Sequence, residues 1–172
     1  MKKLLILGAG GYGKTIADVA AQLGCYETIL FLDDAKAGNP GVPGKCEEFL
    51  RFADADTEVY PAFGNNAVRM AWIEKLEAQS VSAATLVHPT AYVSPRAVLA
   101  AGVAVLPKAV VNTGCCVEAG CIVNIGALVD HDTILEKGSH VAPGAIVKAE
   151  NRIPAGSKVE SGTVIENRQY PL

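Results

Sequence analysis

Residues 123–147 read VNIGALVDHDTILEKGSHVAPGAIV, and within them an aliphatic side chain recurs at every sixth position, from Val123 to Val147. The same register continues without a break in both directions, so that thirteen units run from Val87 to Val159. A period of six is neither the two of an ordinary strand nor the 3.6 of an α-helix. It is typical of a hexapeptide β-helix, in which three short strands form one coil and the coils stack. We therefore predict a left-handed parallel β-helix over residues 83–172.

The remaining positions of each unit agree with this prediction. Four residues after each aliphatic residue stands a mostly small side chain, such as Ala127 or Ala145, which suits close packing near a corner. The position just before it is glycine in eight of the thirteen units. Glycine supplies turn conformations that are costly for residues with a Cβ.

Residues 1–82 follow a different pattern, in which short apolar runs alternate with amphipathic stretches. Strands are expected over residues 3–7, 28–32 and 58–63, and helices over residues 14–23, 45–52 and 66–78. Alternating strands and helices indicate a parallel sheet covered by helices. Because this region is too short for a full dinucleotide fold, we predict a half-Rossmann βαβαβ domain.

The first predicted strand runs into a glycine-rich turn. Gly8, Gly10 and Gly13 satisfy the G-x-G-x-x-G pattern, and Asp33 follows the last of them by twenty residues. Such a turn allows close backbone approach, and the N-terminus of the next helix attracts phosphate. Three interpretations remain open: NAD binding, binding of a nucleotide-sugar diphosphate, and glycines that are purely architectural. In either ligand interpretation, Asp33 or Asp34 could accept hydrogen bonds from a ribose or a base.

Composition excludes several classes of protein. A net charge of −3 gives no reason to expect nucleic acid as a partner. No stretch approaches twenty apolar residues, so no membrane insertion is expected. The apolar run at the N-terminus is too short for a signal peptide and suits a buried strand. Five cysteines without a CxxC pair indicate reduced thiols in a cytoplasmic protein.

His131 is the strongest candidate for chemistry. Its unit is the one that surrounds an imidazole with carboxylates, Asp130 and Asp132, and Asp132 takes the usual glycine position. An imidazole beside a carboxylate suits a general base near neutral pH. In an ideal strand both carboxylates would point away from His131, so direct contact requires the bend of a coil corner or a carboxylate of another subunit.

The other two histidines are less informative. His88 precedes a proline at the domain junction, where a structural role is expected. It lies too far before His131 along the repeat for a three-histidine zinc site, and no metal is expected. His140 ends the same coil as His131, at a different corner. It is interpreted either as a ligand contact beside a neighbouring subunit's His131 or as a solvated corner residue.

Several motifs together suggest a family. They are GAGGYGK at 8–14 with FLDD at 31–34, and NIG at 124–126 leading to DHD at 130–132 and SHVAPG at 139–144. Through these motifs nearly the whole chain resembles the bacterial sugar O/N-acyltransferases, which include UDP-amino-sugar N-acetyltransferases of bacillosamine type and sialic-acid O-acetyltransferases.

The resemblance implies a homotrimer with active sites between subunits and with acetyl-CoA as co-substrate in the groove between adjacent β-helices. It implies that the N-terminal domain binds the nucleotide sugar and that His131 removes a proton from the attacking amine, oriented by Asp132 or Asp130. The residues implied for the nucleotide sugar are Gly10, Gly11, Tyr12, Gly13, Asp33, Asp34 and Asn124. Those implied for acetyl-CoA are His140, Gly144 and Ala149.

Two departures from the family pattern bear on the ligands. Tyr12 stands where many N-acetyltransferases carry a sugar-contacting histidine. After Val147 the β-helix looks short, because relatives usually carry one more coil and a longer C-terminal strand, and Ala149 replaces a glycine whose N–H is thought to face the acetyl group.

The leading hypothesis is an acetyl-CoA-dependent N-acetyltransferase of a UDP-linked amino sugar. The alternatives are O-acetylation of a sugar acid, and a catalytically silent trimeric binding or scaffold protein.

Overall fold

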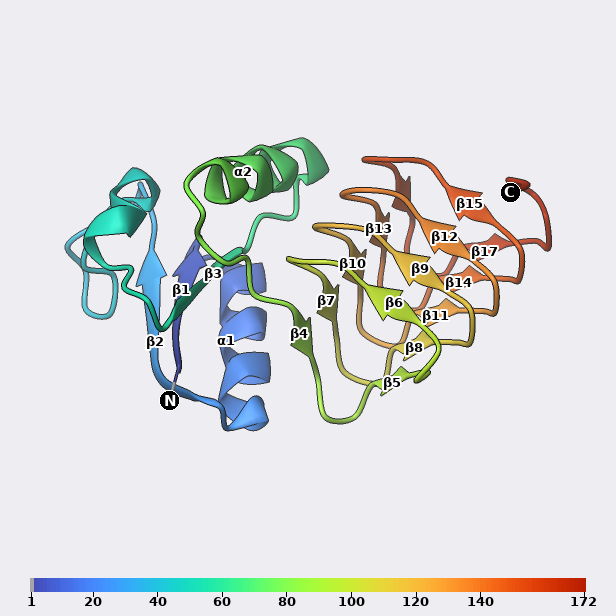
Figure 1. Cartoon of the computed structure of the whole chain (residues 1–172), viewed down its shortest axis with the longest axis horizontal. Coiled ribbons are helices and arrows are strands. Elements are labelled where there is room, and N and C mark those ends of the chain that lie inside the picture. Colours follow the sequence, from blue (N-terminus) through green and yellow to red (C-terminus); the bar gives the residue numbers. More distant parts are fainter. Residues whose placement is uncertain (1) are drawn as a thin grey trace. The chain divides into compact units, whose positions relative to one another are not determined.

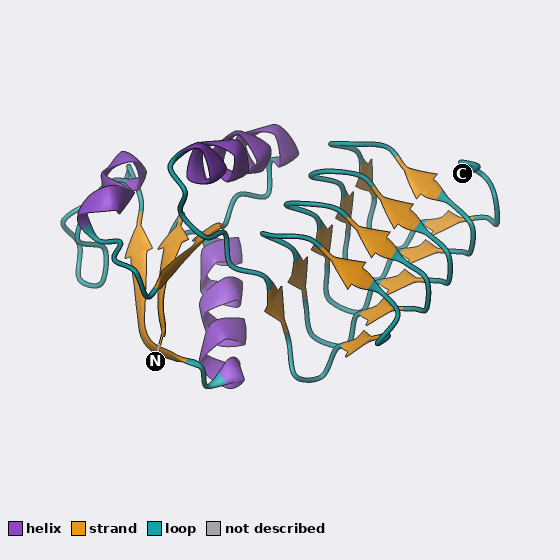
Figure 2. Cartoon of the chain, viewed as in Figure 1, coloured by secondary structure: helices purple, strands orange, loops and turns teal. Residues whose placement is uncertain are grey.

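The computed structural model describes residues 2–172, and the chain divides into two compact units, Met1–Ala84 and Thr85–Leu172. The first unit combines helices and strands, whereas the second consists of short strands joined by turns (Figures 1 and 2). Both predicted architectures are confirmed, an α/β unit followed by a β-helix.

The first unit is built on three parallel strands, β1 (Lys2–Leu7), β2 (Tyr26–Leu32) and β3 (Thr57–Pro61), in the order β2-β1-β3. The central strand β1 is apolar throughout Leu4–Leu7 and is completely buried there, as expected for a strand covered on both faces. Helix α1 (Gly11–Leu23) follows β1, and helix α2 (Asn66–Ala78) follows β3.

Two predictions in this unit are corrected. The helix expected over residues 45–52 is a short 3-10 helix, η1 (Cys46–Arg51). In its first turn, the carboxylate of Glu48 accepts a hydrogen bond from the backbone N–H of Lys45. Helix α1 begins three residues earlier than expected, at Gly11, with Gly10 as its N-cap. The glycine-rich sequence therefore supplies the first turn of the helix as well as the loop before it.

The second unit contains fourteen two-residue strands arranged on three faces, and each strand pairs in parallel with the strand eighteen residues away. The first face contains β4 (Leu86–Val87), β7 (Ala104–Val105), β10 (Ile122–Val123), β13 (His140–Val141) and β16 (Lys158–Val159). The second face contains β5 (Tyr92–Val93), β8 (Val110–Val111), β11 (Leu128–Val129), β14 (Ile146–Val147) and β17 (Val164–Ile165). The third face contains β6 (Val98–Leu99), β9 (Cys116–Val117), β12 (Ile134–Leu135) and β15 (Arg152–Ile153).

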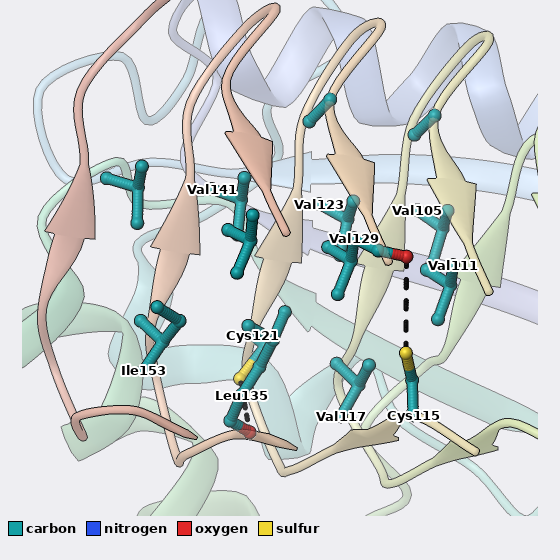
Figure 3. Packing of buried hydrophobic residues seen from close by; sticks show 14 of the residues in the cluster. Val105, Val111, Cys115, Val117, Cys121, Val123, Val129, Leu135, Val141 and Ile153 are labelled. Atoms are coloured by element: carbon teal, nitrogen blue, oxygen red, sulfur yellow. Dashed lines mark hydrogen bonds between the residues drawn. The ribbon is translucent and has the colours of Figure 1, made fainter. Parts of the chain in front are cut away.

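The aliphatic residue of each unit points into the β-helix and forms one continuous core (Figure 3). Cys115 and Cys121 line this core at the small-residue position, and their thiols lie 3.1 Å from the carbonyl oxygens of Asp130 and Glu136. All five cysteines are free. The thiols therefore act as small core residues that satisfy carbonyl groups at the corners.

We name the turns by the faces they join: the first corner joins the first and second faces, and the second corner joins the second and third. In the second corner, the usual glycine position is held by Asp132 and, one coil later, by Glu150, both with positive φ. A positive φ is unfavourable for residues with a Cβ, although Asp tolerates it better than most. Across the β-helix glycine is therefore the usual residue at this position, whereas in the second corner Gly114 keeps it and Asp132 and Glu150 replace it.

The stack does not end early after Val147. Residues 148–151 form a regular corner, and β15, β16 and β17 continue the coils beyond it. The buried amide of Asn151 donates hydrogen bonds to the carbonyls of Lys148 and Glu166 and accepts one from the N–H of Tyr170. These contacts fasten the last turn to the coil beneath it, a role that the sequence analysis did not foresee.

Candidate active site

The second corner at residues 130–133, which we call the histidine corner, lies between β11 and β12 and brings an imidazole and a carboxylate together. Nδ1 of His131 lies 2.8 Å from Oδ2 of Asp132, and both side chains are about half exposed. The bend at Asp132, with φ of 55°, makes this contact between sequence neighbours possible. A proton on Nδ1 donated to Asp132 leaves the lone pair of Nε2 available to accept another.

Asp130 has a different task. Its Oδ1 accepts hydrogen bonds from the backbone N–H of His131, at 2.7 Å, and from the amide of Asn112, at 2.9 Å. Asn112 belongs to the preceding coil, so Asp130 fixes the backbone of the histidine corner to its neighbour. The sequence left open which carboxylate would orient His131; in this structure Asp132 contacts the ring and Asp130 contacts the backbone.

Gly114 makes room for the carboxylate of Asp132. It occupies the same corner position one coil earlier, and a Cβ there would lie 2.3 Å from Oδ1 of Asp132. That distance is far below van der Waals contact, so only glycine fits without moving the aspartate. Gly114 and Asn112 are site residues that were not predicted from the sequence, although both stand eighteen residues before the carboxylates that they contact or accommodate.

Nearby carboxylates stabilise the charged form of the imidazole. The hydrogen bond to Asp132 raises the pKa of His131 above its ordinary value, and the charges of Asp130, Asp132 and Glu150 act in the same direction. Hydrogen bonds from Asn112 and from the His131 backbone lower the pKa of Asp130. The corner therefore presents a basic imidazole supported by an ionised carboxylate.

His140 is placed differently from the prediction. It is the first residue of β13 rather than a corner residue, and it is 8% exposed. The amide of Asn124 donates a hydrogen bond to Nε2 of His140 at 2.9 Å, while the Asn124 carbonyl oxygen accepts from the N–H of Ile125. The two predicted ligand residues are thus hydrogen-bonded to each other. They lie beside the first corner, at the opposite edge of the second face from His131.

The remaining coenzyme candidates lie on these two corners. Gly144 is one coil above Gly126 in the first corner, with a φ of 67° and open space where a Cβ would be. Ala149 is the counterpart of His131 one coil later and is 1% exposed. The N–H of Glu150 donates a hydrogen bond to the carbonyl of His131 at 3.1 Å. This bond places Ala149 and Glu150 directly beside the histidine corner, one coil later.

The glycines of the N-terminal turn differ in their surroundings. A Cβ on Gly13 would lie 2.0 Å from the carbonyl oxygen of Gly8, so Gly13 is required for packing helix α1 against the turn. Gly10 and Gly11 have nothing within 4 Å of a built Cβ. Together with the N-terminus of α1, they leave an open approach of the kind that suits a phosphate group.

The two acidic residues after β2 already hold backbone groups. Oδ2 of Asp33 accepts from the N–H of Ala9 at 2.8 Å, and Oδ1 accepts from the N–H groups of residues 35 and 36. Oδ1 of Asp34 accepts from the N–H of Cys46. In this structure the two carboxylates therefore shape the loops around the glycine turn.

A pocket of about 340 Å³ opens beside the glycine turn, and its lining includes Ala9, Lys14, Phe31, Lys36, Asn39 and Val42. Nζ of Lys36 donates to the carbonyl of Ala9, which places a cation next to the turn. Tyr12 lies on the first turn of α1, and its hydroxyl forms a hydrogen bond of 2.7 Å with the hydroxyl of Tyr60 on β3. Burial is the main cause that raises the pKa of Tyr12, so its hydroxyl stays neutral.

A search of residues 2–172 found no cluster of three or more His, Cys, Asp or Glu side chains arranged to hold a metal ion. Over the same residues, neither helix is long and apolar enough to cross a membrane.

Comparisons with known proteins cover both units. Residues 3–76 match the family described as the PglD N-terminal domain. UDP-N-acetylbacillosamine N-acetyltransferase of Bacillus subtilis is 32% identical over a 113-residue alignment that covers 62% of this chain and 52% of that protein. The match thus spans about half the length of this curated relative.

Solved structures give longer matches. The acetyltransferase domain of PglB from Neisseria gonorrhoeae FA1090, in complex with acetyl coenzyme A, superposes with a TM-score of 0.92 at 36% identity, over 97% of this chain and 83% of that chain. A variant of perosamine N-acetyltransferase from Caulobacter crescentus, in complex with CoA and GDP-perosamine, superposes with a TM-score of 0.60 at 25% identity, over 98% and 92% of the two chains.

Proposed function

The chain belongs to the PglD-type family of sugar N-acetyltransferases with a hexapeptide-repeat β-helix, and from this premise we propose that it transfers the acetyl group of acetyl-CoA to the amine of a UDP-linked amino sugar. The observation that carries the proposal is the contact between Nδ1 of His131 and the carboxylate of Asp132. An imidazole held in this way is the arrangement that a general base requires.

In the proposed reaction the sugar nitrogen attacks the thioester carbonyl carbon, and Nε2 of His131 takes a proton from that nitrogen. The new C–N bond forms, the C–S bond breaks, and the sulfur leaves with the proton returned by His131. Asp132 holds the ring in the tautomer that keeps Nε2 unprotonated before the reaction and stabilises the imidazolium that forms. The N–H of Ala149, beside the histidine corner, is proposed to donate to the developing oxyanion.

The nucleotide sugar is proposed to bind at the glycine turn. Gly10 and Gly11 leave the N-terminus of α1 open, and Lys36 adds a positive charge at its edge. Both features favour the diphosphate of a nucleotide sugar. Tyr12 lies on the same first turn and is proposed to contact the sugar. Asn124, His140 and Gly144, which lie on the first face and first corner, are proposed to contact ligand across a subunit boundary.

The activity is testable by the release of free thiol from acetyl-CoA. We expect thiol release with a UDP-linked 4-amino sugar that exceeds the rate with the same sugar acetylated at nitrogen by at least about 10²-fold, since only the free amine can attack. The panel includes GDP-linked amino sugars and free sugar acids. Release with a sugar acid alone would favour O-acetylation, and binding of neither substrate in calorimetry would favour a scaffold.

A homotrimer is part of the proposal. The outward residues of the second face form an unbroken apolar column. They are Tyr92, Val110, Leu128, Ile146 and Val164. Tyr92 is 54% exposed and Val164 43%, and a contiguous apolar column of this kind marks an interface between proteins. The second face also separates the histidine corner from the first corner, so pairing it with another copy would bring His131 near that copy's Asn124.

Light scattering tests this assembly. We expect the parent protein to have three times its chain mass of 17.9 kDa, and Leu128→Arg, in the middle of the column, to reduce that mass because a charge cannot be buried there unpaired. Val98→Arg on the exposed third face is the matched control and is expected to keep the parent mass. A parent monomer at micromolar concentration contradicts the shared active site.

The five free cysteines also support the proposal that the protein works in a reducing, cytoplasmic compartment.

A further inference from the structure

Next to the histidine corner, one column of the β-helix carries charged side chains on successive coils. The usual glycine position of the second corner holds Arg96, Gly114, Asp132, Glu150 and Arg168, each eighteen residues after the last. The last three all have positive φ, between 54° and 58°. Because coils repeat in parallel register, residues at this spacing are stacked neighbours, and Asp132, Glu150 and Arg168 follow each other along the edge of the β-helix.

Backbone hydrogen bonds fix this stacking. The N–H of Glu150 donates to the carbonyl of His131 at 3.1 Å, and the N–H of Arg168 donates to the carbonyl of Ala149 at 3.4 Å. Nε of Arg168 in turn donates to the Glu150 carboxylate, forming an ion pair in which the Glu150 side chain is 34% exposed. Glu150 is therefore held beside His131 on one side and neutralised from the other.

We propose that Glu150 and Arg168 are positioning residues for His131: Glu150 adds a third carboxylate that favours the protonated imidazole, and Arg168 limits that effect by pairing with Glu150. The acidic groups around the imidazole in the β-helix are Asp130 and Asp132 on its own corner and Glu150 on the next coil. The preceding coil contributes the neutral Asn112 and Gly114 together with the buried thiol of Cys115.

A second cation near Glu150 is already paired. Lys148, two residues before Glu150, pairs with Glu166, which leaves Arg168 as the cation that contacts Glu150. The charge of Glu150 raises the pKa of His131, and the hydrogen bond from Arg168 lowers the pKa of Glu150 and keeps it ionised. The effect on the titration of His131 can be measured without any substrate. Only the expected effect on kinetics rests on the proposed role of His131 as the base.

The test is a titration of His131 by ¹⁵N–¹H NMR, with its signal assigned by its loss in His131→Asn. We expect Arg168→Gln to move the His131 midpoint to higher pH, because it leaves Glu150 uncompensated, and Glu150→Gln to move it to lower pH. Each movement should be about 0.2 pH units or more, since exposed charge pairs contribute little. Asp132→Asn, which removes the direct hydrogen bond, serves as the reference for a large movement to lower pH.

A double variant separates coupling from independent effects. If Arg168 acts through Glu150, the variant with both Glu150→Gln and Arg168→Gln should titrate like Glu150→Gln alone, and Arg168→Lys should restore the parent midpoint. In the active enzyme, the acid limb of kcat/KM should move with the NMR midpoint. Unchanged midpoints in both single variants, or opposite signs, would overturn the proposal. Expected midpoints without any acetyl transfer would retain it and contradict the proposed function instead.

Discussion

His131→Asn is expected to lower kcat for acetyl transfer by about 10²–10⁴-fold, the range that a general base contributes. The physical reason is the loss of the one imidazole nitrogen that is both basic and oriented, since Asp132 holds Nδ1 and leaves Nε2 for the substrate. The side chain of His131 is 44% exposed, so the substitution should leave the fold intact. The measurement is steady-state thiol release at saturating acetyl-CoA and acceptor.

Asn167→Ala is the matched control for this prediction. Asn167 occupies the same corner position two coils later and is exposed, and we place it outside the catalytic and binding groups. It is expected to retain the parent kcat within about twofold, as surface substitutions away from such groups usually do. A loss of less than tenfold in His131→Asn, with the control unchanged, would exclude His131 as the base.

The pH dependence of kcat/KM also tests His131 as the base. A base works in its neutral form, and the hydrogen bond to Asp132 raises the pKa of His131 above its ordinary 6.5. The acid limb of kcat/KM should therefore lie above pH 6.5 in the parent, with activity falling as pH decreases through it.

The six-residue period predicts the coils well because every inward position is buried and packs against the aliphatic side chains of neighbouring coils. It also identifies the histidine corner, since Asp132 breaks the glycine position and stands beside His131. This contact is visible in the sequence because His131 and Asp132 are neighbours in the chain. The helix predicted over residues 66–78 is also confirmed as α2 (Asn66–Ala78), and the structure adds Asn65 as its N-cap.

The partners of the histidine corner are less visible because they come from other coils. Gly114 and Asn112 look like ordinary repeat residues, and their roles appear only when positions eighteen residues apart are stacked. For Asp33, the spacing from the glycine turn predicts a ligand contact, and the structure adds a role that the spacing does not reveal. Its oxygens accept hydrogen bonds from three backbone N–H groups, which shape the loop around the turn.

Gly114→Ala is expected to lower kcat by about 10²-fold, the loss that a misplacement of about 1 Å in a catalytic group can cause. The new Cβ would lie 2.3 Å from Oδ1 of Asp132, so the carboxylate must move and its hydrogen bond to His131 is lost or weakened. The measurements are kcat, the acid limb of the pH profile and the free energy of unfolding. We expect the acid limb to move to lower pH, because the imidazolium loses the partner that stabilises it.

Gly156→Ala separates this effect from backbone strain. Gly156 also occupies a corner with positive φ, at 66° against 72° for Gly114, but nothing lies within 4 Å of a Cβ built on it. Both alanines are therefore expected to destabilise the fold by a similar amount, about 1–2 kcal/mol, whereas only Gly114→Ala should alter kcat and the pH profile. Equal losses of kcat in the two variants would mean that strain in the coil, rather than the position of Asp132, accounts for the effect. If kcat is unchanged in Gly114→Ala, the carboxylate of Asp132 does not orient the base.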